Sequence, residues 1–435
     1  MTVLRIPYET IEKAGDFLEM EVPEKNLMFQ SIPNEPDPLS DPQKAVEQAM
    51  EAPIESKKFS ELIKGGKKVA FVTENQFRAA PAKDILPDLV RKARDAGCEI
   101  AIAIGSGKVG LVTPEVIREK LGDELVDSGI PIVYNEFDKP DNYRYMGVTS
   151  FGTPLFVHKV VAEADVVITI STTQATLWGY GGSGMIIPAV SGDETIEINH
   201  VMSLAPDCIP GNNECRMQED KYEALDIVGV DMGINVIVDN RGRITYVNAG
   251  APVLSHKVAV KEYDRIYRFS VPELSHRKAD IAITGTTTVT HNLYLHNSWA
   301  SVNCDPVVRE GGVIIHATPS PGLAGKSGFA IMDIMKKYLP ASEEKRVKAI
   351  KDFYAGKIRE EQLWLGCVWY KIYEVMCKKE VWLVTAKENL AVCEDIGFRA
   401  FESLDDAYAE AMEKCGNDAQ VASIPFGRYT VIRPW

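Results

Sequence analysis

The sequence lacks a membrane-spanning run, a secretory leader and the closely paired cysteines of most zinc and redox motifs. No stretch of the 435 residues approaches the roughly 18 apolar residues that a transmembrane helix needs. The first residues, MTVLRIPYETIEKAG, contain no apolar core of a signal peptide. The eight cysteines include no CxxC pair, a pattern typical of reduced thiols in a protein core. We therefore expect a cytoplasmic protein that does not contact a membrane.

Positive charge is also scarce. The chain has 48 Lys and Arg against 62 Asp and Glu, a formal net charge of −14. A strongly acidic surface disfavours nucleic acids and anionic membranes as partners. A buried site can still be locally positive, and the loops described below predict a small anionic metabolite as the ligand.

Two of the scattered cysteines lie close together in the sequence. Cys208 and Cys215 flank a Pro-Gly-Asn-Asn turn and could meet in space. Reduced core thiols are the simpler interpretation, and a metal site at this turn is the alternative.

The pattern of strands and helices predicts an α/β fold with two domains. A chain of this length is too long for one core. From Lys67 onward, Val- and Ile-rich strands alternate with amphipathic helices, which is typical of mostly parallel sheets flanked by helices. We expect an N-terminal domain over 1–270, a C-terminal domain over 271–435 and a ligand cleft between them. The apolar segment 360–376 indicates a buried helix or a contact in a homo-oligomer.

The most informative segment is 164–200, ADVVITISTTQATLWGYGGSGMIIPAVSGDETIEINH. It predicts a buried strand over 166–170, a glycine-dense loop, a stop at Pro188 and a helix carrying His200. A glycine loop after a parallel strand leaves backbone N–H groups open to an anion. The alternative is an ordinary tight turn.

Four other loops follow strands and carry polar side chains. Arg78 in 73–81 and Lys108 in 105–110 are suited to a carboxylate or phosphate, although both could be ordinary turn residues. The loop 285–297 contains His291 and His296, whose spacing fits no standard zinc pair. Either imidazole alone could act as an acid or base. The fourth loop, 317–328, ends in a Gly-Lys-Ser that lacks the earlier glycine of a nucleotide-binding P-loop.

Six segments resemble, in the same order, motifs of the nickel-pincer lactate racemase family. They are FRAAP at 77–81, AIGSGK at 103–108, QATLWGYGGSG at 174–184, ETIEINH at 194–200, GNNECR at 211–216 and NLYLHNS at 292–298. The segment at 194–200 is very close to the family's E-T-I-x-x-N-H helix. The resemblance covers most of the chain and implies the family's N- and C-terminal domains.

The resemblance also implies a chemistry. In that family an α-hydroxy acid is racemised by removal of hydride from C2, with a nickel ion on a pyridinium-derived pincer nucleotide as the oxidising centre. A Lys of the glycine loop tethers the nucleotide. Two His residues take the hydroxyl proton, and another His helps to hold nickel.

This sequence departs from the family pattern at the reacting groups. The family's first proton-accepting His falls on Gly107, beside Lys108, and the second falls on Ala175, beside Gln174. The tethering Lys falls on Gly184 or Met185, and the substrate-side Lys falls on Ser298. The resemblance therefore implies a family scaffold with a rebuilt site.

We predict the following site residues from these patterns and from the resemblance. The proton-transferring candidates are Lys108, His200, His291 and His296; the cofactor-binding candidates are Arg78, Trp178, Gly179, Tyr180, Gly181, Gly182 and Gly184; the substrate-binding candidates are Arg78, Gln174 and Ser298; the metal-ligand candidate is His200.

Three functions are compatible with these residues. The first is an isomerase, a racemase or epimerase, acting on a small α-hydroxy-carboxylate or sugar acid. The second is a lyase or hydrolase of an anionic substrate on the same scaffold. The third is a non-catalytic ligand-binding or sensor protein, in which Trp178 and Tyr180 would stack on a flat ligand.

Overall fold

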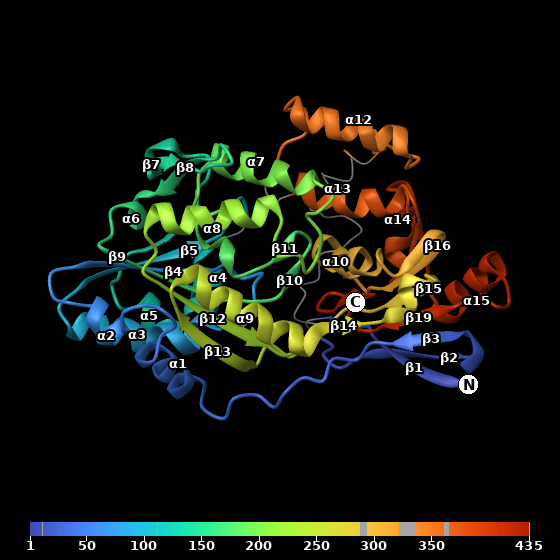
Figure 1. The fold of residues 1–435 in the computed structure, drawn as a ribbon, viewed down its shortest axis with the longest axis horizontal. Coiled ribbons are helices and arrows are strands. Elements are labelled where there is room, and N and C mark those ends of the chain that lie inside the picture. The colour runs from blue at the N-terminus through green and yellow to red at the C-terminus, as the bar shows by residue number, and fades with distance from the viewer. Residues whose placement is uncertain are drawn as a thin grey trace.

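The computed structural model describes residues 1–10, 12–110, 112–287, 294–321, 334, 336–360 and 365–434; the side chains of 294–297 and 365 lie outside this description. The fold is α/β with two domains, as the sequence predicts, and Figure 1 shows one sheet in each. Among the described residues, no helix is long and apolar enough to cross a membrane.

The sheet of the first domain has six strands in the order β13-β12-β9-β4-β5-β6. Five of them run parallel, and β13 pairs antiparallel with β12. The strands are β4 (Lys68–Glu74), β5 (Glu99–Gly105), β6 (Ile132–Tyr134), β9 (Val166–Thr172), β12 (Met232–Val238) and β13 (Ile244–Gly250). Short hairpins join β7 (Tyr143–Val148) to β8 (Pro154–His158) and β10 (Ala175–Thr176) to β11 (Gly179–Tyr180).

Alternate residues of β4 explain why helices cover both faces of this sheet. Val69 and Phe71 enter a core that is shared with the third helix, whereas Ala70 and Val72 enter a core on the other face. Successive side chains of a strand point to opposite faces, so a strand that is apolar throughout needs two cores. The helices are α1 (Pro42–Glu51), α2 (Phe59–Leu62), α3 (Ala82–Asp95), α4 (Pro114–Leu121), α5 (Asp123–Val126), α6 (Lys159–Ala162), α7 (Asp193–Val201), α8 (Arg216–Val228) and α9 (Pro252–Tyr267).

The sheet of the second domain is parallel throughout, in the order β18-β17-β16-β15-β19-β3. Its strands are β3 (Leu27–Gln30), β15 (Ala279–Thr284), β16 (Val308–Ala317), β17 (Glu380–Val384), β18 (Arg399–Phe401) and β19 (Val421–Ile424), and β14 (Arg268–Ser270) pairs separately with β20 (Val431–Arg433). Its helices are α10 (Tyr294–Cys304), α12 (Glu343–Tyr354), α13 (Leu365–Met376), α14 (Leu390–Asp395) and α15 (Leu404–Cys415).

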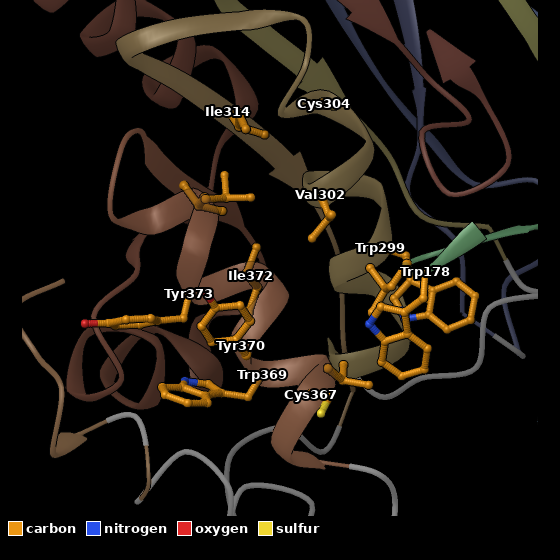
Figure 2. Packing of buried hydrophobic residues seen from close by; sticks show 14 of the residues in the cluster. Trp178, Trp299, Val302, Cys304, Ile314, Cys367, Trp369, Tyr370, Ile372 and Tyr373 are labelled. Atoms are coloured by element: carbon orange, nitrogen blue, oxygen red, sulfur yellow. The ribbon is translucent and has the colours of Figure 1, made fainter. Parts of the chain in front are cut away.

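The apolar helix α13 is buried inside the chain. Trp369, Tyr370 and Tyr373 are fully covered, and Figure 2 shows them in one cluster with residues of α10. Burial within the chain accounts for the apolar faces of this helix, so they require no subunit contact.

The first 30 residues lie with the second domain. β1 (Thr2–Pro7) and β2 (Phe17–Val22) form a hairpin, and β3 adds the last strand to the second sheet beside β19. The predicted ranges 1–270 and 271–435 place this segment in the first domain. In Figure 1 the chain after β3 then crosses to the first domain at α1. Pairing with the open edge of β19 satisfies the backbone of β3, and the local sequence does not specify such a distant partner.

Candidate functional site

The principal pocket lies beyond the carboxyl ends of β4, β5 and β9, where ligands of parallel sheets bind. It encloses about 760 Å³ of space, including some open solvent. Three of the predicted loops line it, and Trp299 of α10 adds a wall from the second domain. The pocket therefore lies where the two domains meet, as the sequence predicts.

Close packing explains the glycines of the loop. Gly182 has φ of +105°, and a Cβ atom at this position would lie 2.7 Å from Cδ2 of His256. Gly179 has φ of +118°, and its Cβ would lie 2.6 Å from the carbonyl oxygen of Asn212. His256 belongs to α9, and its Nε2 lies 2.7 Å from the carbonyl oxygen of Gly181. Only glycine allows the loop to pass so close to its neighbours.

Arg78 reaches the pocket from the loop after β4. Its guanidinium lies 5.1 Å from the ring centre of Trp299, whose ring also contacts Arg428 at 4.3 Å. Burial and the nearby charge of Arg428 lower the pKa of Arg78 to about 10, whereas Glu74 opposes the shift. Arg78 therefore stays charged at neutral pH in a site that already carries positive charge.

The carboxylate of Glu74 is engaged in holding two loops together. It accepts hydrogen bonds from the backbone N and Oγ1 of Thr172 at 2.9 Å and from the backbone N of Ala80 at 3.2 Å. These contacts fix the loop of Arg78 against the start of the glycine loop. Glu74 therefore adds a negative charge to the pocket and also holds these two loops in position.

Lys221 lines the pocket but is not among the residues that the sequence predicts for it. It lies on α8 and lines the pocket with 6 % of its surface exposed. Among the described residues, none forms an ion pair with its ammonium group or accepts a hydrogen bond from it. Burial lowers the pKa of Lys221; Cys208, Cys215 and Asp220 oppose this shift, and the charge of Arg78 adds to it. The sequence did indicate that Lys221 is buried, because it lies one helical turn from Met217 and one from Leu225, on the apolar face of α8.

His200 reaches the same pocket from α7. Its Nδ1 lies 3.0 Å from the carbonyl oxygen of Ile196, and a carbonyl only accepts, so Nδ1 carries the hydrogen. Burial lowers the pKa of His200 to about 3, and Lys221 adds to the shift. The imidazole is therefore neutral, with a lone pair on Nε2. Asn199 fixes this part of α7 by donating to Asp220 of α8 at 2.7 Å.

Comparisons with known proteins agree with this architecture. Residues 15–208 match the lactate racemase N-terminal domain, and residues 274–432 match the lactate racemase C-terminal domain. The chain belongs to the lactate racemase family. It is 23% identical over 403 residues to a lactate racemase of Thermoanaerobacterium thermosaccharolyticum, a match that covers 89% of this chain and 90% of that protein.

Solved structures show the same fold. The lactate racemase apoprotein from Thermoanaerobacterium thermosaccharolyticum superposes with a TM-score of 0.86 at 20% identity, covering 99% of this chain and 100% of that one. A protein from Thermotoga maritima superposes with a TM-score of 0.64 at 15% identity, covering 92% and 100% of the two chains.

The structure places most of the predicted loop residues of this family member at the pocket. Those that line it are Arg78, Gln174, Trp178, Tyr180, Gly181, Gly182, Gly184 and His200. Gly179 instead supports the loop from behind, and Ser298 is fully buried in α10 beside Trp299. His291 lies outside the described residues, as does the side chain of His296.

Lys108 is buried beside the pocket but does not line it. Its ammonium forms ion pairs with Asp193 at 2.5 Å and with Glu197, and it donates to the carbonyl oxygen of Glu360 at 2.7 Å. Only 1 % of its surface is exposed. Its role as a proton-transferring group stays a prediction, and its observed contacts join α7 to the second domain.

The residues present do not fit the family's tethered nickel-pincer nucleotide. The glycine loop carries no Lys, and Gly184 and Met185 occupy the tether position that the resemblance indicates. His200 offers one nitrogen ligand, but the positions of the two proton-accepting His residues hold Gly107 and Ala175. Among the described residues, no group of three or more His, Cys, Asp or Glu could hold a metal ion. The chemistry that this pocket can support therefore depends on the protein's own side chains.

Proposed function

We propose that this chain is an isomerase, a racemase or epimerase, that acts on a small α-hydroxy-carboxylate or sugar acid bound by its carboxylate between Arg78 and Lys221. The observation that carries the proposal is the buried ammonium of Lys221, which faces the pocket without an anionic partner among the described residues. An ammonium removed from water is costly unless an anion pairs with it.

The charge of the pocket favours a ligand with one negative charge. Arg78 and Lys221 bring two positive charges to its lining, and Glu74 brings one negative charge that its hydrogen bonds already engage. A monocarboxylate would balance the remaining charge. The planar guanidinium of Arg78 suits a carboxylate because both can form two parallel hydrogen bonds.

His200 adds selectivity for a hydroxyl group beside that carboxylate. Its unprotonated Nε2 can accept a hydrogen bond, and Lys221 lies close enough to lower the pKa of His200. An α-hydroxy acid carries its hydroxyl on the carbon next to the carboxylate, so one ligand satisfies both groups.

One of these groups can also move a proton. Burial lowers the pKa of Lys221, and its amine form could take the proton from C2 of the bound acid and, as an ammonium, return it to that carbon, so the C2–H bond that breaks is re-formed. His200 would hold the hydroxyl in place by accepting its hydrogen bond at Nε2. Arg78 would keep the carboxylate in place and offset negative charge that develops beside it.

The experiment is a comparison of Lys221→Met with Lys261→Met, which removes an exposed lysine of α9. We expect the wild type to bind an α-hydroxy acid from a panel in calorimetry, and Lys221→Met to weaken binding by about tenfold or more, the loss of a buried charged contact. Lys261→Met should leave the affinity unchanged. If Lys221→Met binds every acid as well as the wild type does, the carboxylate site is wrong.

Turnover is measured separately by incubating single enantiomers in D2O and following the C2 hydrogen and the optical rotation. Inversion at C2 supports the isomerase. Release of a cleavage product would instead favour a lyase or hydrolase, and tight binding without any reaction would favour a ligand-binding protein.

A further inference from the structure

Three sulfur atoms meet behind the glycine loop, outside the pocket lining. Sγ of Cys208 lies 3.6 Å from Sγ of Cys215 and 3.8 Å from Sδ of Met217. All three side chains are fully buried, and both cysteines are free thiols. The expectation that the two cysteines meet across their turn is thus correct, and the thioether of α8 completes a cluster that the spacing did not reveal.

We infer that Cys208, Cys215 and Met217 form a binding site for one monovalent thiophilic metal ion, Cu(I). Two thiolates and a thioether are soft ligands that select Cu(I) over hard cations, which prefer oxygen. The site is closed to water, and beside its three sulfurs it offers Ca²⁺ or Mg²⁺ only the carbonyl oxygen of Trp178, too few oxygen ligands to replace their hydration.

The spacing of Sγ of Cys208 from the other two sulfur atoms suits three-coordination. Three sulfurs placed trigonally around an ion, with bonds of about 2.3 Å as in zinc–thiolate sites, are about 4.0 Å from one another. The two distances from Cys208 are slightly shorter than this, so a small outward shift of the side chains would admit the ion. A structural zinc ion would require a fourth ligand.

The surrounding charge compensates the complex. Binding releases one proton from each thiol, and two thiolates with one Cu(I) carry a net charge of −1. The ammonium groups of Lys221 and Lys371 lie close enough to interact electrostatically with Cys208, and that of Lys221 also interacts with Cys215.

The cluster is connected to the pocket through Trp178. Both thiols donate to the carbonyl oxygen of Trp178, Cys208 at 3.8 Å and Cys215 at 3.6 Å. The indole of Trp178 lines the pocket and packs edge-on against His200. Figure 2 shows Trp178 beside Trp299 at the edge of the aromatic cluster. Metal binding removes the two thiol donors and so changes the surroundings of Trp178.

The test uses the full-length reduced protein without oxygen, titrated with Cu(I) in the presence of bicinchoninate as a competing chelator. We expect one Cu(I) per chain. Cys208→Ser and Cys215→Ser should each weaken binding by roughly 100-fold or more, because each removes a thiolate ligand. Met217→Leu, which conserves volume, should weaken it by about tenfold. Cys98→Ser, at a partly exposed cysteine distant from the cluster, is the matched control.

X-ray absorption of the copper-loaded protein gives the second readout. Three sulfur neighbours would support the proposal, and two neighbours would refute the role of Met217. The proposal is overturned if Cys208→Ser and Cys215→Ser bind Cu(I) like the wild type while their circular dichroism is native. It is equally overturned if the reduced protein binds no Cu(I) and the pair only oxidises to a disulfide.

Discussion

At the scale of single residues, burial and partners decide what two lysines of this family member do. Lys108 is almost completely covered, and its three hydrogens are directed to carboxylate and carbonyl oxygens. Lys221 is nearly as covered but faces a pocket. The contacts of Lys108 join elements of the protein, whereas the ammonium of Lys221 is placed where a ligand could pair with it.

The neutral state of His200 predicts a dependence of stability on pH. Its pKa is about 3 in the folded protein against an ordinary value of 6.5, so below pH 6.5 the unfolded chain binds a proton that the folded chain does not. Stability therefore falls as the pH falls through 6.5, by about 1 kcal/mol at about pH 5.5 for this one group. Urea unfolding at about pH 7.5 and about pH 5.5 should show a smaller loss in His200→Asn than in the wild type. An equal loss in both proteins would refute the assignment.

The sequence alone identified those pocket residues that lie within short motifs. Arg78 and His200 follow from short segments that resemble the family, and both line the pocket. Lys221 stands in no such segment, and its importance depends on α8 packing its buried face toward the glycine loop. Lys108 does lie in such a segment, but its ammonium pairs with Asp193 and Glu197, which lie far along the sequence. Burial of a charge is a property of the packed structure rather than of the local sequence.

At the scale of elements, apolar strands and capped helices were the predictable part of the fold. Thr113 directly before Pro114 is a typical helix start, and its hydroxyl accepts from the backbone N of Val116 at 3.3 Å. The predicted strand over 166–170 lies within β9. The strands β1, β2 and β3 were not predicted, because their segments are rich in Pro and Glu. Pairing with distant strands, rather than local preference, stabilises them.

At this scale, we predict how strongly a side chain at Gly182 destabilises the glycine loop. Gly182→Ala would introduce a Cβ at φ of +105° and 2.7 Å from His256. Gly66→Ala is the matched control, because Gly66 has φ of +80° but no neighbour within 4 Å. We expect the control to lose about 1 kcal/mol from backbone strain and Gly182→Ala to lose about 3 kcal/mol, since overpacking adds to the strain. Unfolding in urea measures both, and equal losses would show that the contact with His256 is unimportant.

At the scale of the whole molecule, a partly buried ionic cluster joins the two domains beside the pocket. Lys108, Asp193 and Glu197 come from the first domain, and Arg359 and Glu360 come from the second. Arg359 pairs with Asp193 at 2.6 Å, and Lys108 reaches the backbone of Glu360. The relative position of the domains, and so the shape of the pocket between them, depends on these contacts.

Glu360 makes this junction sensitive to pH. Its Oε1 accepts from the backbone N of Cys367 at 2.7 Å, whereas its buried Oε2 has no hydrogen-bond partner among the described residues. Burial raises its pKa to about 7 from 4.5, so the folded protein retains a proton that the unfolded chain releases. The favourable contribution is complete below pH 4.5 and is lost as the pH rises through 7.

Glu360→Gln, which mimics the protonated acid, should therefore stabilise the protein at about pH 8 by about 3 kcal/mol and change it much less at about pH 5. Urea unfolding at the two pH values measures the difference, and the value at low pH serves as the control for general effects of the substitution. If the variant is equally or less stable than the wild type at high pH, Glu360 is ionised without cost in the folded protein. The buried carboxyl would then have a compensating partner, and the domain junction would not respond to its titration.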